Sequence, residues 1–221
     1  MTYTYNYPHP AVTVDVAIFT IQDDDFKVLL IERGIEPFEG MWALPGGFVG
    51  IDESLRRAAW RELKEETGVS AAFLEQLSAF GHPDRDPRER VITVAYYALI
   101  PSDRLKLKAS TDAREARLFS MNDLPELAFD HAKILRRAHR RVKDKIDDSV
   151  IALQLVPESF TLSELQRVHE RILGAPLDKR NFRKKVKALD LLTLTGDEKR
   201  GGPHRPAKLY RVKDPADVPY R

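Results

Sequence analysis

The sequence predicts an α/β protein with a mixed sheet, followed by a second, smaller domain. Three observations support this fold class. The 221 residues exceed the usual length of a single domain. Strand-like segments with one helical stretch among them dominate the first part of the chain. Two helical patterns and a hairpin pattern occupy its end.

The elements of the first domain follow from their residue patterns. Apolar and β-branched residues predict strands at 11–21, 26–33, 41–49, 73–81, 90–100 and 115–120. Helical spacing runs from Glu53 to Thr67, with Gly68 placed to cap the C-terminus, and a second helix is expected at 130–146. Strands and helices in this order favour a mixed-sheet α/β sandwich over residues 1–148.

The pattern changes at residues 149–221. A short helix or connector ends at Pro157, and Thr161 with Glu164 forms a capping box for a helix at 161–173. Asp178 is the expected N-cap of a helix at 177–192. Two short strands around a basic, Gly- and Pro-rich loop follow. Helix, turn, helix and hairpin is the order of a winged helix-turn-helix domain.

Composition narrows the class of protein. Hydrophobic residues make up 43% and charged residues 32%, which is typical of a soluble globular chain, and apolar runs are too short to span a bilayer. The start of the chain lacks the pattern of an export signal. Cysteine is absent, which excludes disulfides and thiolate chemistry. We expect a cytoplasmic protein without a membrane partner.

Charge is distributed unevenly along the chain. Residues 1–149 hold 21 Lys and Arg against 25 Asp and Glu, a net charge of −4. Residues 150–221 hold 15 against 9, a net charge of +6. Such a basic segment indicates an anionic partner, and nucleic acid is the obvious candidate.

The first predicted helix concentrates like charges on one side. At 100° per residue, a single face carries in turn Leu55, Ala58, Ala59, Glu62, Glu65 and Glu66. Crowded carboxylates repel one another unless a cation lies among them. Mg²⁺ or Mn²⁺, with oxygen ligands and a bound phosphate or diphosphate, would explain the cluster. An exposed acidic patch explains the helix geometry equally well.

The residues around this helix decide between the two. Gly47 is followed after five residues by Glu53, after seven more by Arg61, and then directly by ELKEETGV (62–69). This spacing resembles the Nudix box at every defined position. The resemblance implies a Nudix hydrolase with an α/β/α sandwich and a mixed sheet.

The resemblance also implies a role for each residue of the box. Glu62, Glu65 and Glu66 would ligate the metal, and Glu53 and Arg61 would help to shape the catalytic loop and helix. Gly46 and Gly47 would permit the turn and the close approach of backbone to substrate. The implied reaction is the metal-dependent hydrolysis of a nucleoside diphosphate linked to another group.

The substrate is indicated by a weaker resemblance. Residues 73–101 look like the corresponding stretch of Nudix proteins that act on ADP-ribose, which favours that ligand. Arg85 and Arg88 could contact its phosphates or ribose. The candidates for a general base outside the box are Asp84, Asp86, Glu89 and Glu115, and those for stacking on adenine are Phe38, Trp42 and Tyr96. For each of these taken singly, a solvated charge or a core position is the commoner role.

The last helix and hairpin carry the candidate DNA contacts. The cations of the helix are Lys179, Arg180, Arg183, Lys184 and Lys187, while Phe182, Val186 and Leu189 form a narrow apolar stripe. Arg200 and Arg205 lie in the expected wing. A basic helix alone is usually a solvated face, but with the preceding helix and the wing it favours binding to double-stranded DNA.

Nearly all of residues 11–212 resemble the Nudix-related transcriptional regulators of NAD metabolism. That resemblance implies a homodimer that binds operator DNA and senses ADP-ribose or a relative. Two functions stay open at this point. One is a Mg²⁺-dependent hydrolase that is also a regulator, and the other is a non-hydrolytic, ADP-ribose-sensing repressor. The complete box of this sequence favours the hydrolase.

Overall fold

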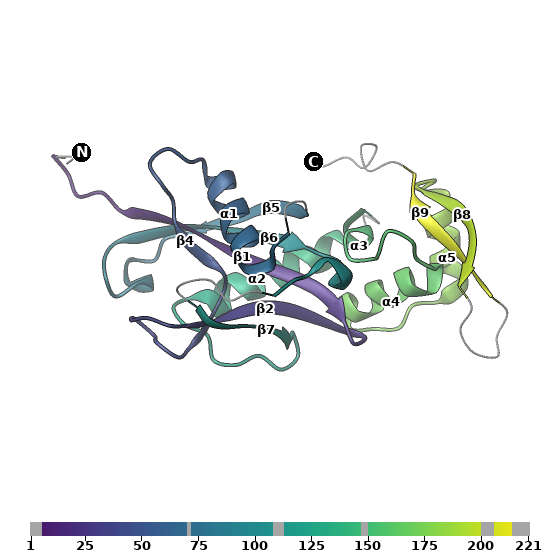
Figure 1. The fold of residues 1–221 in the computed structure, drawn as a ribbon, viewed down its shortest axis with the longest axis horizontal. Coiled ribbons are helices and arrows are strands. Elements are labelled where there is room, and N and C mark those ends of the chain that lie inside the picture. Colours follow the sequence, from purple (N-terminus) through teal and green to yellow (C-terminus); the bar gives the residue numbers. More distant parts are fainter. Residues whose placement is uncertain (1–5, 70–71, 108–112, 147–149, 200–205, 214–221) are drawn as a thin grey trace.

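The computed structural model describes residues 6–69, 72–107, 113–146, 150–199 and 206–213. Figure 1 shows an elongated molecule, with the sheet and its flanking helices at one end and a smaller unit of helices and a hairpin at the other. Within the described ranges, every helix is too short or too polar to cross a membrane.

A seven-stranded mixed sheet forms the centre of the larger unit. Strand β1 (Ala11–Gln22) runs parallel to β6 (Val91–Leu99), and β5 (Phe73–Phe80) pairs antiparallel with the far edge of β6. On the other side β1 is antiparallel to β2 (Asp25–Arg33), which is antiparallel to β7 (Ala113–Ser120). The predicted mixed sheet is confirmed.

Strand β1 changes partner along its length. Its end at Ile18–Gln22 pairs with β2, but its beginning at Thr13–Asp15 pairs with β4 (Gly46–Phe48). Strand β3 (Trp42–Ala43) pairs with β2 instead. The sheet therefore forks between β1 and β2, which diverge in Figure 1. The segment from β3 to β4 fills the fork, because β3 pairs with β2 and β4 pairs with β1.

The prediction of one strand over 41–49 is wrong, because the chain crosses the fork at Leu44 and Pro45. Proline has no N–H to donate to a ladder, so a strand is readily broken there. Its carbonyl still accepts a hydrogen bond from the Val16 amide at 2.8 Å. The crossing delivers Gly46 and Gly47 to the edge of β1, next to the first helix.

One helix covers each face of the sheet. Helix α1 (Leu55–Thr67) buries Ala58, Ala59 and Leu63 against one face, together with Val14, Val16 and Ile18 of β1. Helix α2 (His131–Lys145) buries Ile134, Leu135, Ala138 and Val142 against the other face, where Ala17 and Phe19 point. Alternate residues of a strand point to opposite faces, so β1 contributes to both cores. The α/β/α sandwich is confirmed.

Helix α1 begins at Leu55 rather than at Glu53. Ser54 is the N-cap and its hydroxyl accepts from the Arg57 amide at 3.3 Å, while Gly68 closes the helix in the left-handed conformation with φ 67°. Two short 3₁₀ turns, η1 (Pro83–Arg85) and η2 (Ser102–Arg104), lie in loops between strands.

The smaller unit is the predicted winged helix. It contains α3 (Val150–Leu153), α4 (Leu162–Leu173), α5 (Lys179–Ala188) and the antiparallel pair β8 (Leu192–Lys199) and β9 (Ala207–Val212). The capping box of Thr161 and Glu164 is present, and Asp178 caps α5. Helix α5 is shorter than the predicted 177–192, because Asp190 takes a left-handed conformation with φ 52° that a helix cannot include.

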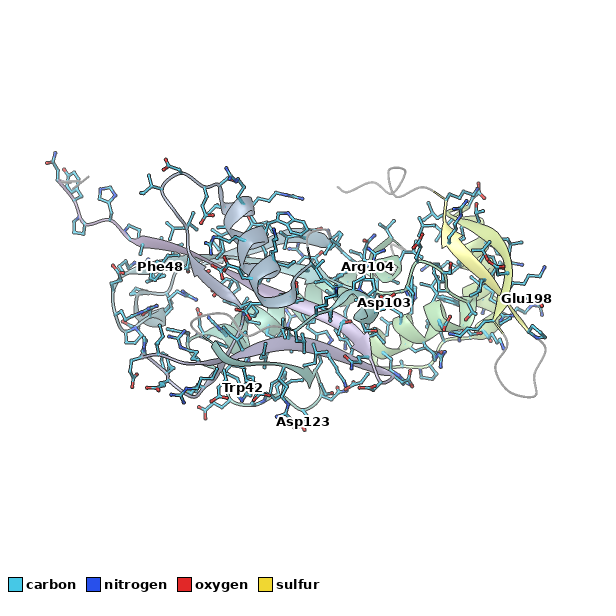
Figure 2. The ribbon with its side chains drawn as sticks, viewed as in Figure 1. Trp42, Phe48, Asp103, Arg104, Asp123 and Glu198 are labelled. Atoms are coloured by element: carbon cyan, nitrogen blue, oxygen red, sulfur yellow. The ribbon has the colours of Figure 1, made fainter. Side chains whose placement is uncertain are left out.

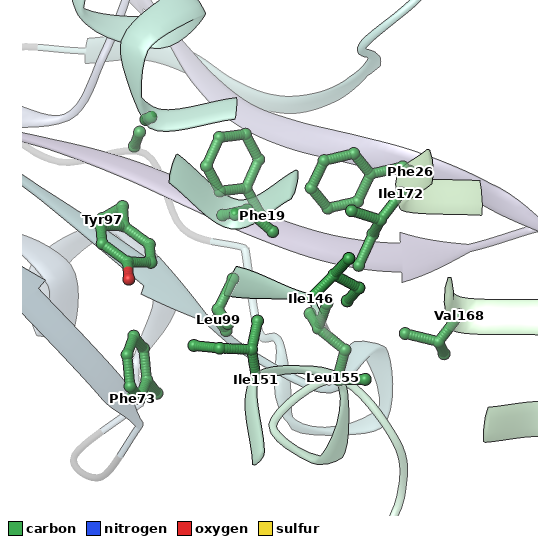
Figure 3. Packing of buried hydrophobic residues seen from close by; sticks show 14 of the residues in the cluster. Phe19, Phe26, Phe73, Tyr97, Leu99, Ile146, Ile151, Leu155, Val168 and Ile172 are labelled. Carbon is green, nitrogen blue, oxygen red and sulfur yellow. The ribbon is translucent and has the colours of Figure 1, made fainter. Parts of the chain in front are cut away.

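The two units share a hydrophobic core. Phe26 of β2 and Ile146 after α2 belong to the same buried cluster as Val168 and Ile172 of α4, and Figure 3 shows these side chains converging. An ion pair between Arg171 of α4 and Asp24 lies beside this cluster. Because residues 147–149 lie outside the described ranges, the division of the chain at residue 148 stays a proposal.

Candidate functional site

A cavity of about 370 Å³ opens where α1, the sheet fork and the start of α2 meet. Its walls include the whole predicted metal set and both predicted substrate arginines. They also include residues to which sequence reasoning gave no role. The lining residues include Asp15, Arg33, Gly46, Gly47, Phe48, Arg61, Glu62, Glu65, Glu66, Arg85, Asp86, Arg88, Phe129 and His131.

The carboxylates of α1 form one wall of this cavity. Glu62 and Glu66 are buried, at 7% and 2% exposure, and Glu65 is more exposed. Arg61 Nη1 donates to Glu62 at 2.6 Å, and Arg61 Nη2 donates to Glu53 at 2.9 Å and to the Phe48 carbonyl at 3.1 Å. Arg61 and Glu53 therefore tie the carboxylate helix to the end of β4.

Burial and the positive charge of Arg61 act in opposite directions on the pKa of Glu62. Burial raises its pKa above the usual glutamate value, and the neighbouring carboxylates of Glu65 and Glu66 add to this rise. The hydrogen bond and positive charge of Arg61 offset part of it. The hydrogen bond from Arg61 also lowers the pKa of the Glu53 carboxyl. A site that raises a carboxyl pKa through burial and like charge favours a bound cation.

Both glycines of the segment from β3 to β4, hereafter called the fork segment, are closely packed. A Cβ on Gly47 would lie 2.4 Å from Glu62 Oε1, and one on Gly46 would lie 2.4 Å from the Val14 carbonyl oxygen. Real Cβ atoms essentially never approach another atom this closely. Glycine at position 47 allows the segment to lie directly against Glu62, and glycine at position 46 allows it to lie directly against β1.

The three glutamates of α1 offer the kind of ligand atom that a hard divalent cation prefers, but their side chains are not positioned around one point. Glu62, Glu65 and Glu66 offer only carboxylate oxygens, which Mg²⁺ prefers. Across the described residues, however, no three His, Asp or Glu side chains are arranged to hold a metal ion. Arg61 engages the Glu62 carboxylate in this arrangement. The three glutamates could hold Mg²⁺ after a change of side-chain rotamers.

Arg88 also lines the cavity. Asp86 accepts from its Nε at 3.0 Å and from its Nη2 at 2.8 Å, which fixes the guanidinium. Burial works to raise the pKa of Asp86, but the hydrogen bonds from Arg88 prevail and lower it. The guanidinium also lies 5.4 Å from the ring centre of Phe48. Arg88 is thus well placed to meet an anion in the cavity.

Arg85 differs from Arg88 in being enclosed by acids. Its side chain is 3% exposed and donates to Asp130 at 2.8 Å and to Asp15 at 3.3 Å. Two carboxylates therefore neutralise the guanidinium from which sequence reasoning expected a phosphate contact. Arg85 does line the cavity, but its contacts support a role in holding β1 to the start of α2.

His131 completes this buried group, and the sequence prediction missed it. Its Nδ1 accepts a hydrogen bond from the Leu44 amide at 2.9 Å, so Nε2 carries the proton and faces Asp15 Oδ1 at 3.4 Å. Burial lowers the pKa of His131, which keeps the ring neutral, although Asp15 opposes this. The sequence does hold one indication of this buried group. Asp15 is the one charged residue in an apolar strand, and a buried charge needs a partner.

Phe129, which lines the cavity, and Phe38, which packs on its ring, adopt unusual backbone angles. Phe129 (φ 53°) and Phe38 (φ 65°) are both left-handed, and their rings meet edge to face at 4.7 Å. A non-glycine residue in this conformation costs on the order of 1–3 kcal/mol, so the surroundings must enforce it. Arg33 lies over the Phe129 ring at 4.9 Å.

Most of the other candidates for stacking on adenine or for a general base do not line the cavity. Trp42 packs on Phe119 at 4.6 Å, and Tyr96 is 4% exposed in the core. Neither lines the cavity. Of the four base candidates, Asp84, Glu89 and Glu115 are also away from its walls, and Asp86 is engaged with Arg88.

The predicted DNA contacts on α5 all face solvent. Phe182 and Val186 are buried, and the Phe182 ring meets His169 of α4 edge to face at 4.9 Å. The opposite side is exposed and carries Lys179, Arg180, Arg183, Lys184 and Lys187. Arg200 and Arg205 lie outside the described residues. Figure 2 shows Glu198 of the hairpin at the other end of the molecule from Phe48.

Comparison with known families covers both units of the chain. The family described as the NUDIX domain matches residues 11–138. The family described as the NrtR DNA-binding winged helix domain matches residues 152–212. The chain belongs to the Nudix family, among its NrtR-type regulators. Its Nudix domain is therefore fused to a DNA-binding regulatory domain.

Similar proteins extend over most of this NrtR-type chain. The "ADPR responsive transcriptional repressor NtrR" of Acinetobacter baylyi is 39% identical over 210 residues, covering 93% of this chain and 83% of the relative. The "ADP-ribose pyrophosphatase" of Methanocaldococcus jannaschii is 46% identical over 130 residues, covering 59% of this chain and 73% of the relative. Shewanella oneidensis NrtR, crystallised with a 27mer DNA, has 38% identity and a TM-score of 0.81, covering 91% of this chain and 93% of the other.

Proposed function

We propose that this protein is an ADP-ribose-responsive transcriptional regulator whose Nudix domain also hydrolyses the nucleotide. The observation that carries the proposal is the cavity of about 370 Å³, whose walls include three glutamates and Arg88. Carboxylates that hold a cation, with a guanidinium lining the same cavity, suit a bound diphosphate. The names of two relatives, an ADPR-responsive repressor and an ADP-ribose pyrophosphatase, support the same ligand.

In the proposed reaction, different residues of the cavity would bind the metal ion, orient its ligands and contact the phosphates. Glu62, Glu65 and Glu66 would hold Mg²⁺ or Mn²⁺, which polarises a diphosphate and lowers the pKa of water when bound. Arg61 orients the carboxylates, and Gly46 and Gly47 give the diphosphate access to them. Arg88 would contact the phosphates, since its position is already fixed by Asp86.

A second function, a sensor that binds the nucleotide without cleaving it, is favoured by one observation. Arg61 donates to Glu62 at 2.6 Å, and the described carboxylates are not gathered around a common point. A cavity in this state would still take a nucleotide through Arg88. The two functions share the ligand and the DNA site and differ only in turnover.

The DNA partner is proposed from α5. Its exposed cations lie on a helix held by Phe182 and Val186, which suits insertion into a major groove. Arg200 and Arg205, which lie outside the described residues, stay proposed DNA contacts. We also propose a homodimer, because winged-helix operators are commonly two-fold, and light scattering with and without DNA would test this.

One experiment separates the two functions. The protein is incubated with Mg²⁺ and ADP-ribose, NAD, NADH, ADP-glucose or diadenosine polyphosphates, and the release of AMP is followed. Release from ADP-ribose ahead of the other compounds supports the hydrolase. If ADP-ribose stays intact over hours while Glu65→Gln still responds to it in a DNA-shift assay, the protein is a sensor only. Without nucleotide binding or salt-dependent DNA binding, the proposed function fails.

A further inference from the structure

Two elements of the Nudix domain run from the cavity to the winged helix. Strand β2 carries Ile31 and Arg33 in the cavity wall, and Phe26 at its other end lies in the core shared with α4. Helix α2 starts at His131 in the cavity wall and continues towards α4 (Figure 1). Helix α4 packs against both elements.

The cavity end of α2 is joined to the fork segment by His131. Its Nδ1 accepts from the amide of Leu44, at the point where the chain crosses from β3 to β4. Two and three residues later the same segment supplies Gly46 and Gly47 to the site. Any ligand that displaces the fork segment must therefore stretch this hydrogen bond or move the start of α2.

The other end of the connection lies two turns further along α2. The ring of His139 is 5.5 Å from the ring of Phe26. It is also close enough to the main chain of Ile172 in α4 for that polar group to raise the His139 pKa, against the larger opposing effect of burial. Val142 of the next turn belongs to the cluster that contains Ile172. Ile146 after the helix belongs to it as well, and Figure 3 shows Ile146 and Ile172 in this cluster. His139 is thus a polar side chain among the apolar residues that join the two domains.

We propose that α2 transmits occupancy of the cavity to the DNA-binding domain, with His131 as its contact to the site and His139 as its contact to α4. The proposal rests on the proposed function, in that it assumes ADP-ribose in the cavity and DNA on α5. An α-helix is stiff over this length, so a displacement at His131 reaches α4 as a shift or tilt of the whole helix. His139 and Phe26 are positioning residues, because they touch neither ligand.

The factor by which one ligand changes the affinity for the other tests whether α2 transmits occupancy of the cavity. If the nucleotide changes DNA affinity by some factor, DNA must change nucleotide affinity by the same factor. A residue that only supports folding would alter either affinity or the melting temperature. A residue that transmits the coupling alters the shared factor while the two separate affinities stay close to those of the wild type.

The experiment uses the full chain and two defined probes. One is α,β-methylene ADP-ribose, which cannot be hydrolysed at its diphosphate, and the other is a fluorescein-labelled duplex that the protein selects from a random-sequence library. The Kd of each probe is measured with and without a saturating amount of the other. In the wild type we expect the analogue to change the Kd for DNA by about fivefold or more.

The variants are His139→Ala and, as a control on the same helix, Arg140→Ala, which is exposed. We expect His139→Ala to keep both separate Kd values within about twofold and to bring the coupling factor down to about twofold or less. Arg140→Ala should keep the wild-type factor. His131→Phe should lower the factor as well, and combining it with His139→Ala should lower it no further.

Several results would overturn the proposal. One is a wild-type coupling factor in a folded His139→Ala protein, and another is equal loss of the factor in Arg140→Ala. If His139→Ala does not fold, His139→Gln and Phe26→Leu replace it under the same criterion. A wild type that binds both probes without coupling rejects α2 as a transmitter but leaves both binding functions standing. A wild type that fails to bind one probe rejects the proposed function itself, and the transmission proposal with it.

Discussion

Arg85 donates to Asp130 at 2.8 Å with a side chain that is only 3% exposed. The same guanidinium reaches Asp15 at 3.3 Å, so one cation compensates two buried acids. Removing one partner of a buried ion pair is more destabilising than losing an exposed pair, since the remaining charges stay desolvated.

We therefore expect Arg85→Gln to lower the free energy of unfolding by about 3–5 kcal/mol. Urea denaturation followed by circular dichroism measures this change. Arg104→Gln is the matched control, because that arginine is exposed and should change stability by no more than about 0.5 kcal/mol. Equal effects of the two variants would show that the buried pairs contribute little.

Gly47→Ala should disturb the carboxylates without changing any charge. The new methyl group would lie 2.4 Å from Glu62 Oε1, so Glu62 or the fork segment has to move. A displacement of about 1 Å at a catalytic group can cost about 10²-fold in rate, and we expect a loss of that order in ADP-ribose turnover. Gly50→Ala meets its nearest neighbour, Glu53, at 3.5 Å and should stay near wild type. Similar activities of the two variants would contradict the close packing at Gly47.

Glu66→Gln tests whether the metal site performs the chemistry. The substitution keeps the size of the side chain but removes a charge from the wall, so turnover with Mg²⁺ should fall by at least about 10²-fold. Glu89→Gln, which removes a carboxylate from an exposed loop, is the control. Near-normal turnover by Glu66→Gln would count against its assignment as a ligand.

Stability should fall in mildly acid solution because of two histidines. Burial is the main cause that lowers the pKa of His131 and of His139 below the ordinary value of 6.5. The unfolded chain then binds more protons than the folded one below that pH. The stabilisation is complete above pH 6.5 and is lost as the pH falls towards the folded pKa values.

Each histidine contributes up to about 1.4 kcal/mol per pH unit in this window. His139→Gln should remove one such contribution, as measured by urea denaturation between pH 7 and pH 5. Comparison with the wild type at each pH cancels the effects of the carboxyl groups. An unchanged slope would mean that His139 titrates alike in both states.

Helix α5 should control the salt dependence of DNA binding. Neutralising Arg183 or Lys184 should weaken binding to every sequence and reduce the slope of log K against log salt by about 0.9 for each lost phosphate contact. Fluorescence anisotropy over a range of salt concentrations measures the slope. Arg56→Ala removes an exposed cation from α1 in the Nudix domain, and its slope should match the wild type.

The sequence was most informative where a local pattern sets the structure. Helical periodicity placed Glu62, Glu65 and Glu66 on one face, and all three line the cavity. The capping box at Thr161 and Glu164 likewise depends on residues three apart. Such features need no knowledge of distant partners, which is why both helices and the fold class were predictable.

The rest of the site depends on contacts between distant segments. His131 meets Leu44 across 87 positions, and Arg85 meets Asp130 across 45. No periodicity in the sequence records these pairs, so Arg85 was expected to contact substrate and His131 was given no role. The division of 41–49 into two strands was missed for the same reason, because it depends on where β1 and β2 separate.

The fork in the sheet has a consequence for how such a site can diversify. Gly46 and Gly47 are held at β1 by main-chain pairing. Such pairing uses backbone groups and therefore does not depend on the identity of the β1 side chains. The loop between β2 and β3, with Ile35 and Phe38, leaves and rejoins the sheet on the β2 side. Changes in that loop can alter which ligand enters while the glutamates keep their position, so selectivity and chemistry can be altered separately in this fold.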